Sequence, residues 1–106
     1  MTGGDPVAGY VIAIVEVTNA EGYAEYARRV PATIAKYDGR YLVRGGTTDI
    51  REGDWPGSRT VILEFPSLAR ALEWYESAEY KPLRPIRQAN STARIAFFEG
   101  AAKGAG

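Results

Sequence analysis

The stretch that most constrains the fold runs from Arg59 to Asn90, where one strand signal is followed directly by two helical signals. A short aliphatic run stops at Phe65-Pro66, and Ser67 is placed to cap a helix. Apolar residues then recur at the spacing of one helix face, at Leu68, Ala71, Leu72 and Tyr75. Ser77 is placed to cap a second helical segment. That segment carries Tyr80, Leu83, Ile86 and Arg87.

The period of the apolar residues predicts the other elements. We expect further strands over Tyr10–Thr18, Arg40–Gly46 and Thr92–Glu99, and a helix over Ala20–Tyr37. Pro31 should kink that helix without dividing it. Gly45-Gly46 should mark a bulge or a close backbone approach at the end of the second strand. We expect a single domain over residues 9–100, with flexible termini at residues 1–8 and 101–106.

The resulting order is β-α-β-β-α-β, which indicates the α+β class and a ferredoxin-like fold. In this fold a four-stranded antiparallel sheet carries its helices on one face. We expect the first and third strands to be parallel neighbours in the middle of the sheet. The first strand is apolar on both faces, because Tyr10, Ile12 and Ile14 alternate with valines and an alanine. An apolar face without helices favours a homodimer in which two sheets pack together.

Composition excludes several classes of function. Thirteen basic and thirteen acidic residues are interleaved, which argues against nucleic-acid and membrane partners. There is no Cys and no His, so we expect no metal site and no cofactor. The longest apolar run, Val11–Val15, is too short to cross a bilayer. The N-terminus lacks the basic region of a signal peptide, so we expect a cytoplasmic protein.

Four motifs carry a family resemblance: the runs 39–46 (GRYLVRGG), 52–55 (EGDW), 64–67 (EFPS) and 74–80 (WYESAEY). Together they resemble the family catalogued as domain of unknown function 1330, over roughly Tyr10 to Gly100. The resemblance implies a dimeric α/β-barrel, in the superfamily of small cofactor-free monooxygenases, dye-type peroxidases and chlorite dismutases. It implies no activity. Asp38 stands where the family usually has a glycine, which affects a helix C-cap.

Two glutamates at matching positions are the candidate catalytic residues. Glu16 lies three residues before the helix cap Asn19, and Glu64 lies three residues before the cap Ser67. On parallel neighbouring strands the two carboxylates would lie close together, and one pKa would rise unless a cation intervened. Arg44 is the candidate cation. The alternative is structural: both carboxylates reach solvent at the strand ends, or pair with arginines across the dimer.

A second group of residues predicts a ligand pocket between the sheet and the helices. Its members are Arg44, Arg87, Trp74, Ser77 and Tyr80, with Trp55 in a candidate lid over residues 52–55. An arginine beside aromatic rings can bind a carboxylate or phosphate bidentately while the rings cover the rest of a small ligand. The alternative is that the rings are ordinary core and that Arg87 pairs with Glu64 or Glu79. The loop with Trp55 would then be a dimer contact.

Two classes of function remain open. The first is a dimer that binds a small anionic or aromatic molecule without chemistry. The second is a cofactor-independent enzyme, monooxygenase-like or isomerase-like, with Glu64 or Glu16 as base and Arg44 or Arg87 as anion clamp. Only the superfamily analogy supports the second class. Haem chemistry ranks third because there is no His ligand, although ligation by Tyr stays open.

Overall fold

A computed structural model describes residues 7–102. The elements are β1 (Gly9–Val17), α1 (Ala20–Lys36), β2 (Arg40–Arg44), β3 (Arg59–Phe65), α2 (Leu68–Tyr75), a 3-10 turn (Lys81–Leu83), α3 (Arg84–Asn90) and β4 (Ser91–Glu99). The predicted order of strands and helices is therefore confirmed. Most of the two termini that we expected to be flexible, residues 1–8 and 101–106, lies outside the described residues.

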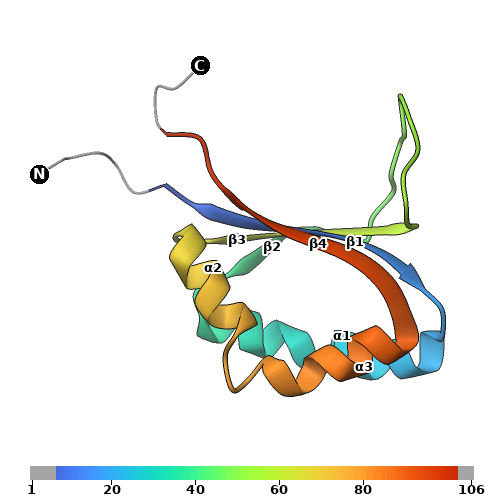
Figure 1. The fold of residues 1–106 in the computed structure, drawn as a ribbon, viewed down its shortest axis with the longest axis horizontal. Coiled ribbons are helices and arrows are strands. Elements are labelled where there is room, and N and C mark those ends of the chain that lie inside the picture. Colours follow the sequence, from blue (N-terminus) through green and yellow to red (C-terminus); the bar gives the residue numbers. More distant parts are fainter. Residues whose placement is uncertain (1–6, 103–106) are drawn as a thin grey trace, which may run out of the picture.

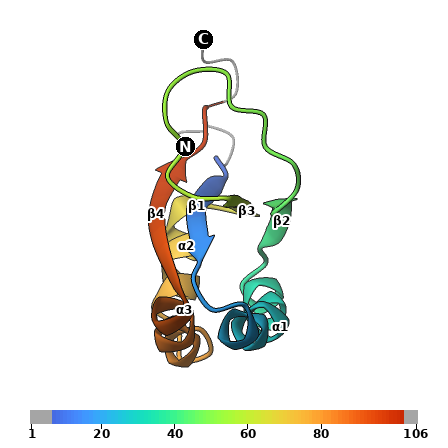
Figure 2. The ribbon, with the colours of Figure 1, turned by 90° about the vertical axis from the view of Figure 1, so that its right-hand side faces the viewer.

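The four strands form one sheet in the order β2-β3-β1-β4, and the helices cover one of its faces (Figure 1). Figure 2 shows α1 and α3 side by side beneath this sheet, and the two helices are in contact. This is the predicted α+β, ferredoxin-like arrangement. Within residues 7–102, no helix is both long and apolar enough to cross a membrane.

All neighbouring strands run antiparallel, so the expected parallel pairing of the first and third strands is wrong. The reason lies in the connections between the strands. The crossover through α1 makes β1 and β2 parallel to each other. A loop joins β2 to its neighbour β3 as a hairpin, which reverses the direction of β3. Because β3 is inserted between β1 and β2, it is antiparallel to both.

The core lies between the sheet and the helices. From the strands it contains Val11, Val15, Leu63 and Phe65. From the helical segments it contains Tyr23, Tyr26, Val30, Ile34, Ala71, Trp74, Tyr80 and Leu83. Helix α1 continues through Pro31 as one helix, as predicted, and Asn19 caps its start by accepting from the Gly22 N–H at 3.4 Å. The alternation of buried and exposed residues along each strand thus sets which side chains face the helices.

Strand β2 ends at Arg44, two residues earlier than expected, and its pairing with β3 is irregular within the strand, not at its end. The register with β3 shifts between Tyr41 and Val43, not at Gly45-Gly46. Gly45 has a positive φ of 71°, and an added Cβ would collide with the guanidinium of Arg59. The positive φ favours glycine there, and the guanidinium of Arg59 would have to shift to make room for a Cβ.

The other face of the sheet has no helix over it. Along this face lie Tyr10, Ile12, Ile14, Ile62 and Phe98, of which Phe98 is 47% exposed. The loop of residues 45–58 rises on the same side, away from the helices (Figure 1). In this loop Trp55 is 43% exposed, and its indole N–H donates to Thr60 Oγ1 at 3.1 Å.

Candidate functional site

A cavity lies between the helix-facing side of the sheet and the helices. It has a volume of about 40 Å³. Its apolar wall comes mainly from the strands and α1, with Val11, Ala13, Val15, Ala27, Val30, Ile34, Val61, Leu63 and Ile95. Six aromatic residues and three arginines complete the lining. The cavity lies between the sheet and the helices, where the sequence predicted a pocket. The polar groups of its wall determine which ligands it can bind.

The aromatic wall is built around Tyr80, which is 1% exposed. Its ring centroid lies 4.2 Å from that of Trp74, and its hydroxyl lies 2.8 Å from the hydroxyl of Tyr26. Trp74 is held in turn by its indole N–H, which donates to Thr33 Oγ1 at 3.0 Å. Burial, together with the Tyr80 hydroxyl, raises the pKa of Tyr26 well above its ordinary value of 10.0. Tyr26 is therefore neutral at physiological pH and can act as a hydrogen-bond donor but not as a base.

Arg87 is the most unusual residue of the cavity. It sits on α3 and is only 6% exposed. Among residues 7–102 its guanidinium has no ion pair and no hydrogen bond, and its Nε is buried without a partner. The two carboxylates considered as its partners are engaged elsewhere: Glu64 pairs with Arg40, and Glu79 pairs with Lys36. A largely buried cation without a counter-ion is costly, although only its Nε is fully buried and the side chain also borders a surface depression beside Ser91 and Ala93.

Two further arginines line the opposite part of the cavity. Arg44 lies 4.4 Å from the centroid of the Tyr41 ring, and its Nη2 donates to the carbonyl of Ala27 at 3.5 Å. Arg59, which the sequence reasoning missed, packs beside Gly45 and has a buried Nε without a partner. The available signal was its position, since Arg59 alternates with Val61, Leu63 and Phe65 along the helix-facing side of β3. None of the residues described as lining the cavity is acidic.

The two candidate catalytic glutamates do not share a site. Glu64 faces Tyr10 across the β1–β3 pair, whereas Glu16 lies six residues further along β1, which places them about 20 Å apart. Glu64 accepts from Tyr10 at 3.0 Å and pairs with Arg40 at 2.6 Å. These contacts, first that of Arg40 and then that of Tyr10, lower the pKa of Glu64. The prediction of a close carboxylate pair was wrong because the strands run antiparallel.

The contacts of Glu16 and Arg44 also differ from those predicted for the carboxylate pair. Glu16 accepts from the backbone N–H of Ser58 at 3.1 Å, at the other end of the sheet. Arg44 cannot bridge the two carboxylates, because it lines the cavity on the helix side while both glutamates lie on the helix-free side. Both glutamates therefore lie outside the cavity.

Ser77 and Trp55 do not line the cavity. Ser77 is buried, donates to the carbonyl of Trp74 at 2.7 Å and accepts from the Tyr80 N–H at 3.1 Å. It thus shapes the turn that positions Trp74 and Tyr80, while the helical segment after it begins only at Lys81. Trp55 lies on the helix-free side of the sheet, so its loop does not cover this cavity (Figure 1). Of the six expected ligand-binding residues, the structure brings Arg44, Arg87, Trp74 and Tyr80 together.

Between residues 7 and 102 there is no cluster of three or more His, Cys, Asp or Glu side chains that could hold a metal ion. The polar groups that line the cavity are guanidinium and phenol groups and one indole. This set offers cations and hydrogen-bond donors, which suits an anionic ligand.

A family model described as Domain of unknown function (DUF1330) matches residues 8–101. The match agrees with the resemblance that the sequence motifs carry. Among curated proteins, no sequence matches the chain.

Solved structures with the same fold include three at low sequence identity. A protein of unknown function from Rhodopseudomonas palustris aligns with a TM-score of 0.74 at 19% identity, over 92% of this chain and 85% of that chain. SnoaB, a cofactor-independent oxygenase from Streptomyces nogalater, aligns with a TM-score of 0.58 at 15% identity, over 92% and 95%. A conserved protein from Methanosarcina mazei aligns with a TM-score of 0.56 at 14% identity, over 91% of this chain and 95% of that chain. These similarities establish the fold alone, a four-stranded antiparallel sheet with its helices on one face.

Proposed function

The chain belongs to the family described as domain of unknown function (DUF1330), and on that premise we propose that it binds a small anionic molecule between its sheet and its helices. The anionic group of the ligand meets the guanidinium of Arg87. Its apolar or aromatic part lies against Trp74 and Tyr80. The observation that carries the proposal is Arg87 itself, which is 6% exposed and has no carboxylate partner among residues 7–102.

The physical argument concerns the free energy of burying a charge. An ion removed from water without a partner costs on the order of several kcal/mol. A carboxylate bound to Arg87 offsets that cost, because a planar guanidinium donates two parallel hydrogen bonds to it. The rings of Trp74 and Tyr80 shield the pair from water, which strengthens it.

A second candidate is a cofactor-independent enzyme, and its support is the shared fold with SnoaB, which is described as a cofactor-independent oxygenase. In such an enzyme Arg87 would clamp the substrate anion. Neither Glu16 nor Glu64 can serve as the base in this cavity, since both lie on the other side of the sheet. The neutral Tyr26 cannot replace them. We therefore place binding before catalysis.

The test uses tryptophan emission, because Trp74 forms part of the cavity wall and the chain has only two tryptophans. In a Trp55→Phe background all tryptophan emission comes from Trp74. Small aromatic and aliphatic carboxylates titrated into this protein should change the emission saturably. Arg87→Lys keeps the charge but loses the planar fork, so it should weaken binding about tenfold to hundredfold.

Arg28→Lys is the matched control, because Arg28 is exposed on α1 and does not line the cavity. It should leave the affinity unchanged. If no carboxylate binds below millimolar concentration, or if Arg87→Lys binds as well as the parent protein, Arg87 is a structural residue and the proposal fails.

For the assembly we propose a cytoplasmic homodimer that pairs through the helix-free face of the sheet. The support is the row of apolar residues on that face, including Ile12 and Ile62, which are paired in register at its centre. An apolar sheet face left open to water favours association. The fold of the dimeric α/β-barrel proteins agrees with this arrangement.

A further inference from the structure

A second cationic group lies in the same cavity, apart from Arg87. Arg44 and Arg59 come from adjacent strands, and Arg59 packs against the backbone of Gly45, the residue that follows Arg44. Within the described residues neither guanidinium has an ion pair, and the Nε of Arg59 is buried without a partner. Both arginines act on the phenol of Tyr41, whose pKa burial raises and the two charges lower. Two neighbouring like charges without a carboxylate repel each other unless an anion lies between them.

The two cationic groups occupy different parts of the cavity. Arg44 and Arg59 belong to β2 and β3, while Arg87 lines both the cavity and a surface depression formed by Ser91, Ala93 and Ile95 of β4. In the sheet order, β1 separates β3 from β4. Two strand spacings amount to about 10 Å between the backbones. All three arginines nevertheless line the one cavity, so its cations come from two different sides.

We propose that the ligand of this cavity is a short dianion, with one negative group held by Arg87 and the other by Arg44 and Arg59. This inference rests on the proposed function and names the class of ligand. Three guanidinium groups and no carboxylate line the cavity, so a monoanion would leave two charges unbalanced. The volume of about 40 Å³ favours a compact molecule such as a three-carbon dicarboxylate over a long one. Arg44 lines the cavity and is also exposed, so we expect a ligand to enter beside it.

The experiment compares two probes of nearly equal size that differ by one charge, malonate and monomethyl malonate. Isothermal titration at fixed ionic strength gives the dissociation constant of each with the wild-type protein. Malonate should bind about tenfold to hundredfold more tightly, because it gains a second set of charge-assisted hydrogen bonds. Arg59→Gln and Arg44→Gln should each reduce this ratio several-fold.

Arg28→Gln is the control for a change of net charge, and it should preserve the ratio. The comparison of the two probes on the wild-type protein needs no variant, so a variant that fails to fold leaves the test intact. If both probes bind equally well, the second anion site does not exist, although the proposed function stands. If the preference for malonate persists in both Gln variants, Arg44 and Arg59 do not form the site. If neither these probes nor any other carboxylate binds, the proposed function fails and the inference fails with it.

Discussion

The contacts of each charged residue in the sheet depend on the face it occupies, either the face covered by the helices or the helix-free face. Arg59 lies on the helix side, in a row with the buried Leu63 and Phe65, and reaches the cavity. Glu64 lies on the helix-free side, where Arg40 and Tyr10 bind its carboxylate. Because successive side chains along a strand alternate between faces, a shift of one residue would exchange these roles. The cavity therefore collects cations while the carboxylates lie outside it.

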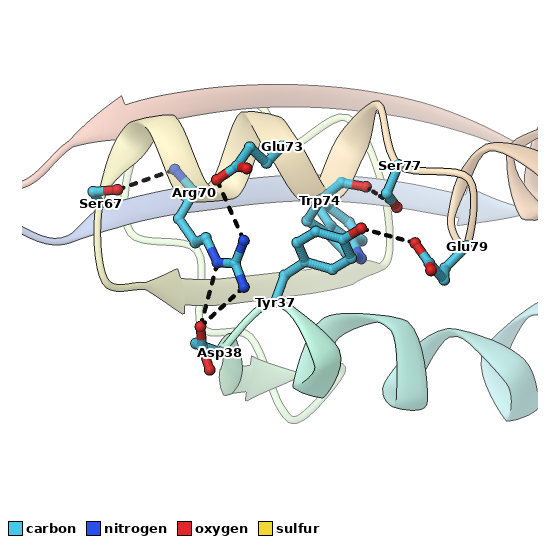
Figure 3. A network of polar contacts seen from close by, with 8 residues as sticks. All are labelled: Tyr37, Asp38, Ser67, Arg70, Glu73, Trp74, Ser77 and Glu79. Carbon is cyan, nitrogen blue, oxygen red and sulfur yellow. Dashed lines mark hydrogen bonds and ion pairs between the residues drawn. The ribbon is translucent and has the colours of Figure 1, made fainter.

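Glu79 should make stability depend on pH. Its carboxylate accepts from the Tyr37 hydroxyl at 2.8 Å (Figure 3). It also pairs with Lys36. The contact with Lys36, followed by that with Tyr37, lowers the pKa of Glu79 from 4.5 to about 2. A carboxylate whose pKa is lower in the folded state contributes stability that is complete above its unfolded pKa. That contribution disappears as the pH falls through the folded pKa.

Thermal melts between about pH 6 and pH 2, the window set by these pKa values, should thus show a smaller loss of stability for Glu79→Gln than for wild type. Glu52→Gln, in the exposed loop, is the control and should follow the wild-type curve. Parallel curves for wild type and Glu79→Gln would contradict the role of Glu79.

At the scale of elements, α2 depends most on its neighbours, since it has only eight residues. A helix of that length is not stable alone in water. Ser67 caps its start, and Arg70 joins it to the end of α1 through Asp38 at 3.2 Å (Figure 3). Asp38 has a positive φ of 67°, and its ion pair with Arg70 accounts for an acidic residue where a glycine would be less strained. These contacts fix the helix that carries Trp74 into the cavity.

Removing the cap should weaken α2 measurably. The Oγ of Ser67 accepts from the Arg70 N–H at 3.0 Å, so Ser67→Ala should lower the free energy of unfolding by about 1 kcal/mol. Ser67→Asp keeps an acceptor at the same place and should retain most of the stability. Urea denaturation followed by circular dichroism measures both. Equal losses for the two variants would show that the serine hydroxyl does not act as a cap.

At the scale of the whole molecule, one layer of helices covers only one of the two sheet faces (Figure 2). The uncovered face carries apolar residues along three strands, including Ile12, Ile62 and Phe98. The loop with the exposed Trp55 stands beside it (Figure 1). The site and the uncovered face lie on opposite sides of the sheet, so binding and association can be tested separately.

The proposed dimer can be tested by its mass in solution and by a variant that should dissociate it. Light scattering on a sizing column at micromolar protein should give twice the mass of the chain. Ile12→Glu places a charge at the centre of the helix-free face and should yield a folded monomer. Leu72→Glu is the control, because Leu72 is 45% exposed on α2, away from that face. A wild-type monomer would contradict both the dimer and the barrel that two sheets would form.

The sequence by itself determined the order of the elements, because the periodicity of helices and strands and the caps of helices depend on residues close together in the chain. The asparagine and serine caps, the continuous α1 through Pro31 and the aromatic residues near Trp74 were predicted in this way. So were Arg44 and Arg87 as cavity arginines. Each of these depends on spacing within one segment or on a residue type that suits a pocket.

Only the tertiary structure decided which charges meet. The direction of β3 relative to β1 depends on hydrogen bonds between segments about fifty residues apart, as between Tyr10 and Glu64, and no local period encodes it. That direction separated Glu16 from Glu64. The same packing turned Arg59 toward the helices and left Arg87 buried without a carboxylate. A strand pattern shows that two faces differ, but the covering helices determine which face is inside.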